Sequence, residues 1–379
     1  SLNRVLGSTP SNIAGQVNSN GNVILVNPNG VFLTKSGAVR SNSFTASSLD
    51  IKTGDFLEGR HNFYKNKTSK GVENHGKVEV DTSGHAALLG NYASNKGIIV
   101  AKYGKIFMGA GEQITLDFSG NGLMKVTVPT RELSSITDIN GETLESLVAN
   151  NGSLIAEGGY IQLSAKTAEN LMLGAVNVGS SGIISTASID HQTGNVVIGG
   201  DDNNFVNIEG NINISSINPL TPSGALTITG TNVYYGGETN ASGSNGGKIS
   251  ANAKKMLVLD SSIVAKGLHE NGGNLIVVSE DVLLSTTQTN ANMSGSINGG
   301  SIKLHADSHN LVAGTFKADG DTGQGGNLDF AGQIVGLSAA DISAKGSSQG
   351  GKVRIGGEYL GGQQLSTVSQ KEYDGFINR

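Results

Sequence analysis

The sequence predicts an all-β protein, a single right-handed parallel β-helix in which each coil stacks on the previous one. Three observations predict it: a Gly-Gly repeat, three short apolar runs in every repeat, and a glycine-rich composition that is poor in aromatics. In the repeat, a Gly-Gly pair is followed by any residue and then by an aliphatic residue. The five copies start at Gly246, Gly272, Gly299, Gly325 and Gly350, so successive starts lie 26, 27, 26 and 25 residues apart. A nearly fixed spacing of this size is typical of a solenoid.

Each repeat contains three short runs of apolar residues. Ile302 and Leu304 alternate with polar residues in a first run, residues 282–284 form a second run, and residues 342–346 form a third. Alternation with a period of two predicts strands, and the Gly, Ser, Asn and Asp residues between the runs predict turns. One coil cannot bury its inner face alone. Stacked coils bury that face and pair their backbones at a spacing of about 4.8 Å.

The composition supports one elongated body. The chain of 379 residues has 56 glycines, 5 prolines, no tryptophan and 5% aromatic residues. We expect the glycines to supply the positive φ angles that the corners of each coil require. Scarce proline and the absence of a Gly-X-Y register exclude collagen. The apolar runs continue along the chain and argue against disorder.

Charge and cysteine content narrow the class of partner. The net charge is −5 and the 26 Lys and Arg residues are scattered, so we predict no nucleic-acid binding. No apolar run is long enough to span a membrane, and we predict no membrane insertion. Cysteine is absent, which excludes disulfides and suits a chain that passes through an oxidising periplasm.

The most specific stretch is the tetrapeptide Asn27-Pro28-Asn29-Gly30 between the apolar runs 23–26 and 31–33. Proline presets φ at the second turn position, and Asn-Gly readily adopts the left-handed conformation. On the residues alone, this tetrapeptide is a tight corner between two strands.

Three segments around this tetrapeptide together resemble the two-partner-secretion exoproteins, which include high-molecular-weight adhesins, filamentous haemagglutinin and haemopexin-binding exoproteins. The segments are residues 3–5, 21–31 and 43–51. The resemblance implies a right-handed β-helical secretion domain, exported by a partner outer-membrane β-barrel. It also implies that Asn27, Pro28, Asn29 and Gly30 belong to the secretion signal read by that transporter.

The family domain usually begins several dozen residues earlier, with capping strands and another Asn-rich motif. We therefore expect this chain to lack part of its N-terminal cap and both of its ends to continue in a longer protein. We divide it into a secretion-domain-like β-helix over 1–200 and further β-helix repeats over 201–379. Pro219 and Pro222 mark a loop near this boundary.

Two segments interrupt the coils. Residues 54–70 concentrate aromatics and Lys, and we predict a surface hairpin there, with a ligand site as the alternative. Residues 142–150 carry Leu144, Leu147 and Val148 at helical spacing, which predicts a short helix that covers one end or side of the coils.

Asparagine recurs before glycine in successive coils. We expect Asn74, Asn95 and Asn151 to stack side chain on side chain as a ladder. Five asparagines also stand in Asn-x-Ser/Thr triplets, the acceptor pattern for glycosylation. They are Asn66, Asn151, Asn213, Asn240 and Asn292. High-molecular-weight adhesins are glycosylated at such triplets before export, so the resemblance implies the same here, whereas chance occurrence is the simpler alternative.

Catalytic and metal-binding patterns are weak. Calcium-assisted lyases and inverting glycosidases need paired carboxylates, and the pair Asp201-Asp202 has no basic residue nearby in the sequence. His305 and His309 lie four residues apart, but solvated turn histidines are a simpler reading than a metal or haem site. We predict no enzyme, no metal site and no cofactor.

The sequence therefore predicts a fragment of a secreted or surface-displayed bacterial adhesin, a stiff binding stalk that is monomeric. Its predicted partners are an outer-membrane two-partner-secretion transporter and a host cell-surface receptor or glycan. Haem or haemopexin capture is the main alternative. A polysaccharide-active β-helix enzyme and a toxin-delivery stalk are weaker alternatives.

Overall fold

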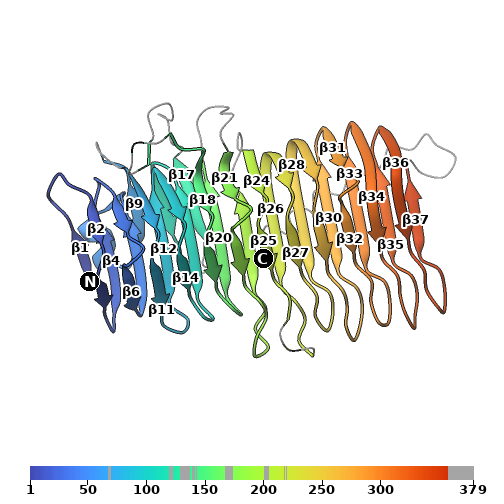
Figure 1. Ribbon diagram of the computed structural model, residues 1–379, viewed down its shortest axis with the longest axis horizontal. Helices are drawn as coiled ribbons and strands as arrows, with labels where there is room; N and C mark the ends of the chain where they lie inside the picture. Colours follow the sequence, from blue (N-terminus) through green and yellow to red (C-terminus); the bar gives the residue numbers. More distant parts are fainter. Residues whose placement is uncertain are drawn as a thin grey trace.

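Stacked coils of parallel strands make up almost the whole described chain (Figure 1). The computed structural model describes residues 1–379 except 67–69, 119–122, 129–136, 139–140, 142, 167–173, 200–204, 217, 219 and 357–379. Within the described residues, 33 strands form one sheet in which every inter-coil pairing is parallel, and four more form a second, antiparallel sheet. The predicted all-β parallel β-helix is confirmed.

The coils present three faces. Along the first face lie β1 (Leu2–Arg4), β4 (Asn22–Val26), β7 (Ser43–Ser47), β12 (His85–Gly90), β15 (Lys105–Ala110), β20 (Tyr160–Ala165), β23 (Asn195–Gly199), the first halves of β26 (Ala225–Tyr235) and β28 (Lys248–Leu259), β30 (Asn274–Ser279), β33 (Ser301–Ala306), β35 (Asn327–Ala331) and β37 (Lys352–Ile355).

The second face follows after one corner. It holds β2 (Ser11–Ile13), β5 (Val31–Leu33), β10 (Gly71–Asn74), β13 (Tyr92–Asn95), β18 (Ser146–Asn150), β21 (Gly174–Val178), β24 (Phe205–Ile208), the second halves of β26 and β28, β31 (Val282–Ser285) and the first halves of β34 (His309–Lys317) and β36 (Ile334–Ser343).

The third face completes each coil. It holds β3 (Gln16–Asn18), β6 (Ala38–Ser41), β11 (Lys77–Val80), β14 (Ile98–Val100), β19 (Ser153–Ile155), β22 (Ile183–Ser185), β25 (Asn211–Asn213), β27 (Glu238–Asn240), β29 (Ser262–Val264), β32 (Asn290–Asn292) and the second halves of β34 and β36. The prediction that the first two runs of each repeat are separate strands is wrong for β28. This strand continues from the first face into the second and pairs with both β30 and β31.

Aliphatic columns fill the interior. In the first four copies the residue that follows Gly-Gly-x is an interior residue, and Ile249, Leu275, Ile302 and Leu328 pair in register at no more than 1% exposure, whereas Val353 of the last copy is 48% exposed. Because one face of the strands inside the stack is buried, a register slip of one residue would expose the whole column. The hydrophobic pattern therefore specifies both the winding and the stacking.

The Gly-Gly pairs serve close packing rather than positive φ. None of their glycines is among the described residues with left-handed backbone. A Cβ on Gly300 would instead lie 2.0 Å from the carbonyl oxygen of Gly273 in the preceding coil, and a Cβ on Gly326 would lie 2.0 Å from that of Gly300. The prediction that these glycines supply positive φ is wrong. They are required because no side-chain atom fits between adjacent coils.

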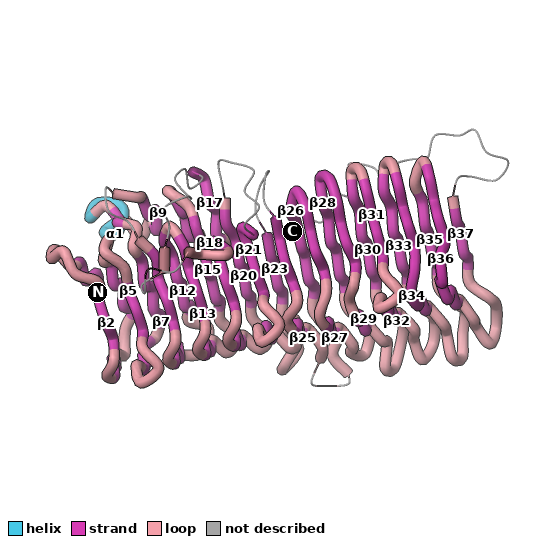
Figure 2. The backbone as a smooth tube through the Cα atoms, turned by 45° about the horizontal axis from the view of Figure 1, so that its top comes forward, coloured by secondary structure: helices cyan, strands magenta, loops and turns pink. Residues whose placement is uncertain are grey.

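An antiparallel sheet leaves the coils near the N-terminal end (Figure 2). It contains β8 (Asp50–Ile51), β9 (His61–Tyr64), β16 (Gln113–Leu116) and β17 (Met124–Val128), and the short helix α1 (Thr53–Leu57) precedes β9. Its apolar side chains pack on Leu89 and Phe107 of the first face. The hairpin predicted at 54–70 is present as the antiparallel pair of β8 and β9, and residues 57–60 are exposed as expected, whereas Phe63 is fully buried against the first face. Residues 67–69 of the predicted segment lie outside the described residues.

The predicted helix at 142–150 is wrong in its described part. Residues 146–150 form β18, which pairs with β13 and β21. Val148 points into the interior column and Leu147 points to the other side, yet both are buried. Leu147 and Val148 lie on opposite sides of the strand, and together with Leu144 they have the spacing that is also typical of one face of a helix.

Candidate functional site: the 27–30 turn and the asparagine corners

Asn27 is a fully buried side chain that ties two coils together. It is 0% exposed and begins the corner between β4 and β5. Its Nδ2 donates to the carbonyl of Thr9 at 3.0 Å and to Oγ of Ser11 at 2.9 Å, both in the preceding coil. Its Oδ1 accepts the backbone N–H of Asn29 at 2.9 Å. These bonds satisfy both ends of a buried amide, and no other side chain has this shape and this pair of functions.

The rest of the tetrapeptide closes the predicted tight turn. Gly30 N–H donates to the carbonyl of Asn27 at 2.9 Å, and Gly30 has φ of 108°, so it alone adopts the positive φ. The Pro28 carbonyl accepts the N–H of Lys70 at 2.9 Å from the next coil. Pro28 and Asn29 are half-buried. The folded surface therefore presents only part of the tetrapeptide.

A buried asparagine ladder stabilises the corner between the second and third faces. Asn74 Nδ2 donates to Asn95 Oδ1 at 2.7 Å, and Asn95 Nδ2 donates to Asn150 Oδ1 at 2.8 Å. All three are at most 1% exposed. The predicted ladder is confirmed for Asn74 and Asn95, but its third rung is Asn150 and not Asn151.

Three Asn-x-Ser triplets have a structural role that sequence reasoning missed. In each, the Asn Oδ1 accepts the backbone N–H of the Ser two residues later at 3.1 Å, a local turn that ends a third-face strand. The three asparagines are Asn213, Asn240 and Asn292. The recurrence of Asn-x-Ser after short apolar strands was the available signal.

The five triplet asparagines differ in exposure. Asn66 and Asn240 are exposed, whereas Asn151, Asn213 and Asn292 are half-buried. The residues that follow Asn66 in its triplet, 67 and 68, lie outside the described residues. The structure therefore does not gather these asparagines into one site.

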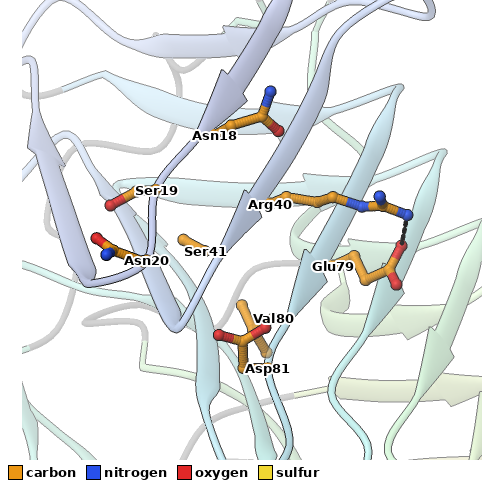
Figure 3. Close-up of a pocket in the computed structure, with 8 residues that line it drawn as sticks. All are labelled: Asn18, Ser19, Asn20, Arg40, Ser41, Glu79, Val80 and Asp81. Atoms are coloured by element: carbon orange, nitrogen blue, oxygen red, sulfur yellow. Dashed lines mark hydrogen bonds and ion pairs between the residues drawn. The ribbon is translucent and has the colours of Figure 1, made fainter.

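A shallow polar groove of about 680 Å³ lies beside the corner that follows the third face (Figure 3). Arg40 Nη2 lies 3.2 Å from Glu79 Oε2, and Lys77 Nζ lies 2.8 Å from the same oxygen. The hydrogen bonds from Lys77 and then Arg40 lower the pKa of Glu79. Glu79 is thus paired with two cations, and the groove does not include the 27–30 turn.

The two histidines considered for metal binding lie apart. His305 lies in β33, and its Nε2 is 3.1 Å from Asp329 Oδ2 of the next coil. The prediction of a solvated turn histidine is therefore wrong for His305. His309 begins β34 and contacts Ser308. Burial alone would raise the pKa of Asp329, but the hydrogen bonds from His305 and Arg354 hold it well below its usual range. Among the described residues no three His, Cys, Asp or Glu side chains converge as metal ligands, and Asp201-Asp202 lies outside them.

His85 begins β12 on the first face of the coils and lies against the end of the antiparallel sheet. Its ring stacks on Phe118 with centroids 4.2 Å apart, and a ring nitrogen lies 3.1 Å from Thr45 Oγ1. Burial, with smaller contributions from the charges of His61 and Lys105, lowers the pKa of His85 to about 4. The neutral ring is therefore the form that the fold stabilises.

This shift predicts acid sensitivity. The folded pKa of His85 is lower than the unfolded value of about 6.5, so the unfolded chain binds more protons as pH falls from about 6.5 to about 4. The free energy of unfolding should fall by about 3 kcal/mol over this window. Urea unfolding at pH 7.5 and pH 4.5 measures it, and His85→Phe should lose most of the difference. An equal pH dependence in that variant would contradict this assignment.

Comparison with known proteins shows the family of this chain. A family model described as the TPS secretion domain, where TPS denotes two-partner secretion, matches residues 1–215, more than half of the chain. The chain belongs to the TPS exoprotein family. TPS exoproteins pass through the periplasm and outer membrane to the cell surface or the medium, and the TPS domain implies an outer-membrane transporter as export partner. The TPS secretion domain itself is not an enzyme domain.

Two curated relatives share part of the TPS chain. A heme/hemopexin-binding protein of Haemophilus influenzae is 27% identical over 237 residues, 60% of this chain and 24% of its own length. A second heme/hemopexin-binding protein of H. influenzae is 24% identical over 234 residues, 55% of this chain and 24% of its own length. The chain thus spans about a quarter of these relatives.

The fold has a solved counterpart. The crystal structure of the HMW1 secretion domain from H. influenzae superimposes with a TM-score of 0.59 at 21% identity, over 93% of this chain and 85% of that chain. This likeness supports the TPS β-helix fold. The described part of the TPS chain contains no helix with the length and hydrophobicity needed to span a bilayer.

Proposed function

We propose that this chain is the secretion domain and the first part of the stalk of a surface-displayed bacterial adhesin. The observation that supports it best is the single parallel sheet of 33 strands. Each strand pairs with the equivalent strand of the next coil, both in the TPS-matched coils and in the Gly-Gly repeats. In such a rod every coil hydrogen-bonds to its neighbours, so it resists bending and holds its far end away from the cell. We assign export to residues 1–200 and display to residues 201–379, a division that the match to residues 1–215 supports.

We propose that residues 27–30 act twice, first as a segment that the transporter reads in the unfolded chain and then as a buried turn. The burial of Asn27 supports this order, because its amide is accessible only before the coils stack. Asn27→Asp keeps the shape but removes the donor to Thr9 and Ser11. We expect it to lower the free energy of unfolding by about 2 kcal/mol and to reduce secretion about tenfold.

Stability and recognition can be separated by a matched variant. Asn95→Ala breaks buried amide bonds in the ladder without touching the 27–30 turn. Both variants are compared in the full-length exoprotein, expressed with its transporter, by the amount of protein in the medium. Loss of secretion in Asn27→Asp alone supports a recognition role. Equal losses in both variants would show that the turn serves folding only.

Adhesion is tested against a second candidate function. Because both curated relatives are heme/hemopexin-binding proteins, capture of haem or haemopexin is the alternative. The full-length exoprotein is assayed for binding to epithelial cells and, in parallel, for pull-down of haemopexin and for spectral titration with haem. Cell binding without haemopexin or haem binding supports the adhesin. The reverse pattern supports capture.

We also propose that the triplet asparagines are glycosylated before export, at Asn66, Asn151, Asn213, Asn240 and Asn292. The geometry of the three Asn-x-Ser turns supports this, because each turn uses Oδ1 as acceptor and a sugar would be carried on Nδ2. Mass spectrometry of the secreted protein from its native host tests it. Unmodified peptides at all five positions would overturn it.

A further inference from the structure

Asn-Gly pairs are chemically fragile, and this chain places several of them at corners. The glycine nitrogen can attack Cγ of the preceding asparagine side chain. A new N–C bond forms, the bond from Cγ to the side-chain nitrogen breaks, and ammonia leaves. Water then opens the resulting succinimide to aspartate or isoaspartate. The reaction needs a glycine nitrogen that is free to turn towards the side chain, so a hydrogen bond from that N–H to a fixed acceptor opposes it.

Three such pairs stack at the Gly-Gly corners, and their asparagines, here called the corner asparagines, are Asn245, Asn271 and Asn298. In each pair the glycine N–H donates to a backbone carbonyl of the next coil: Gly246 to Asn271 at 3.0 Å, Gly272 to Asn298 at 2.9 Å, and Gly299 to Gln324 at 2.9 Å. The attacking nitrogen is thus held in the inter-coil ladder.

The side chains of the corner asparagines are held as well. Asn245 Oδ1 accepts the N–H of Asn271 at 3.2 Å, Asn271 Oδ1 accepts Nδ2 of Asn298 at 2.9 Å, and Asn298 Oδ1 accepts the N–H of Gln324 at 2.9 Å. An attack would break both sets of bonds and separate adjacent coils.

Other described Asn-Gly pairs follow the same rule. Gly30 N–H donates to Asn27 at 2.9 Å, and Gly21 N–H donates to Oγ of Ser19 at 3.1 Å. The pairs at 121–122 and 140–141 lie wholly or partly outside the described residues.

Asn151-Gly152 breaks the rule. Among the described residues the Gly152 N–H has no hydrogen-bond acceptor, although its neighbours do: Asn151 N–H donates to Asn95 at 2.8 Å and Ser153 N–H donates to Gly97 at 2.8 Å. The Asn151 side chain is half-buried over Gly179, where a Cβ would lie 2.0 Å from Oδ1. The Gly152 nitrogen therefore lacks the hydrogen bond that holds the attacking nitrogen at the corner asparagines.

We propose that Asn151, in chains that carry no sugar there, is the site at which the folded chain undergoes spontaneous deamidation through a succinimide, and that the inter-coil ladder protects the corner asparagines. The local sequence Asn-Gly is the same at all four positions, so the fold determines which asparagine deamidates. An isoaspartate at position 151 inserts an extra carbon into the backbone between β18 and β19, where both neighbouring peptides are bonded to the preceding coil.

The test is peptide mapping of the intact chain. The protein is produced without glycosyltransferases, its unmodified mass is checked, and it is incubated at pH 8 and 37 °C in water labelled with ¹⁸O. Mass spectrometry then quantifies aspartate and isoaspartate carrying one ¹⁸O at each Asn-Gly pair. A parallel sample in guanidinium gives the unprotected rate at each position.

We expect conversion at Asn151 to exceed that at each corner asparagine at least about tenfold in the folded chain, which corresponds to about 1.4 kcal/mol of protection. In guanidinium the four rates should agree within about threefold. An unmodified Asn151 in the folded chain would overturn the proposal, and so would corner asparagines that convert as fast as Asn151.

Discussion

Replacing Gly300 by alanine is expected to destabilise the rod by about 3 kcal/mol or more. The new Cβ would lie 2.0 Å from the carbonyl oxygen of Gly273, and that same oxygen accepts the N–H of Ser301 at 2.9 Å. Neither backbone can move away without breaking the inter-coil ladder. The clash therefore costs hydrogen bonds as well as packing, because both coils must separate.

Urea unfolding followed by circular dichroism measures this loss, and Gly350→Ala is the matched control. Gly350 opens the last described copy of the same repeat, has no positive φ, and a Cβ there would meet no atom of the described residues within 4 Å. We expect its free energy of unfolding to change by less than about 0.5 kcal/mol. Equal effects of the two substitutions would mean that the Gly-Gly pairs are needed for chain flexibility and not for close packing.

Replacing Asn95 by alanine is expected to cost about 3 kcal/mol. Its side chain accepts from Asn74, donates to Asn150 and also accepts the N–H of Gly97 at 3.3 Å, all at 0% exposure. The alanine variant leaves a donor on one coil and an acceptor on another buried without partners. A buried polar group without a partner costs more than its hydrogen bond contributed.

The same unfolding measurement with Asn211→Ala provides the comparison. Asn211 is an exposed strand asparagine, so its loss should change the free energy of unfolding by less than about 0.5 kcal/mol. If Asn95→Ala were as mild as Asn211→Ala, the ladder would be a consequence of the fold with no stabilising role.

The sequence was sufficient to predict the architecture because the interior is periodic. Ile249, Leu275 and Ile302 recur at one repeat length, and each occupies the same interior column. The tight turn at residues 27–30 was predicted for the same kind of reason, since Pro and Gly restrict the backbone locally. Both features are encoded by residues close together in the chain.

Features that depend on the neighbouring coil could not be read from the sequence. The packing role of Gly300 depends on a carbonyl 27 residues earlier, at Gly273, and the burial of Asn27 depends on Thr9 and Ser11. The false helix at 142–150 arose because Leu147 and Val148 are neighbours in β18 and both are buried, so both sides of this strand carry a buried apolar residue. A strand buried on both faces loses its period of two, and short apolar runs then fit either pattern.

The central claim is that the described residues between 1 and 356 wind into one stiff rod built from a single stack of coils. Small-angle X-ray scattering of the purified chain tests it most directly. The account predicts a pair-distance distribution with an early peak from the cross-section and a long, nearly linear decline from the length of the rod. A symmetric, bell-shaped distribution, typical of a compact globule, would contradict it.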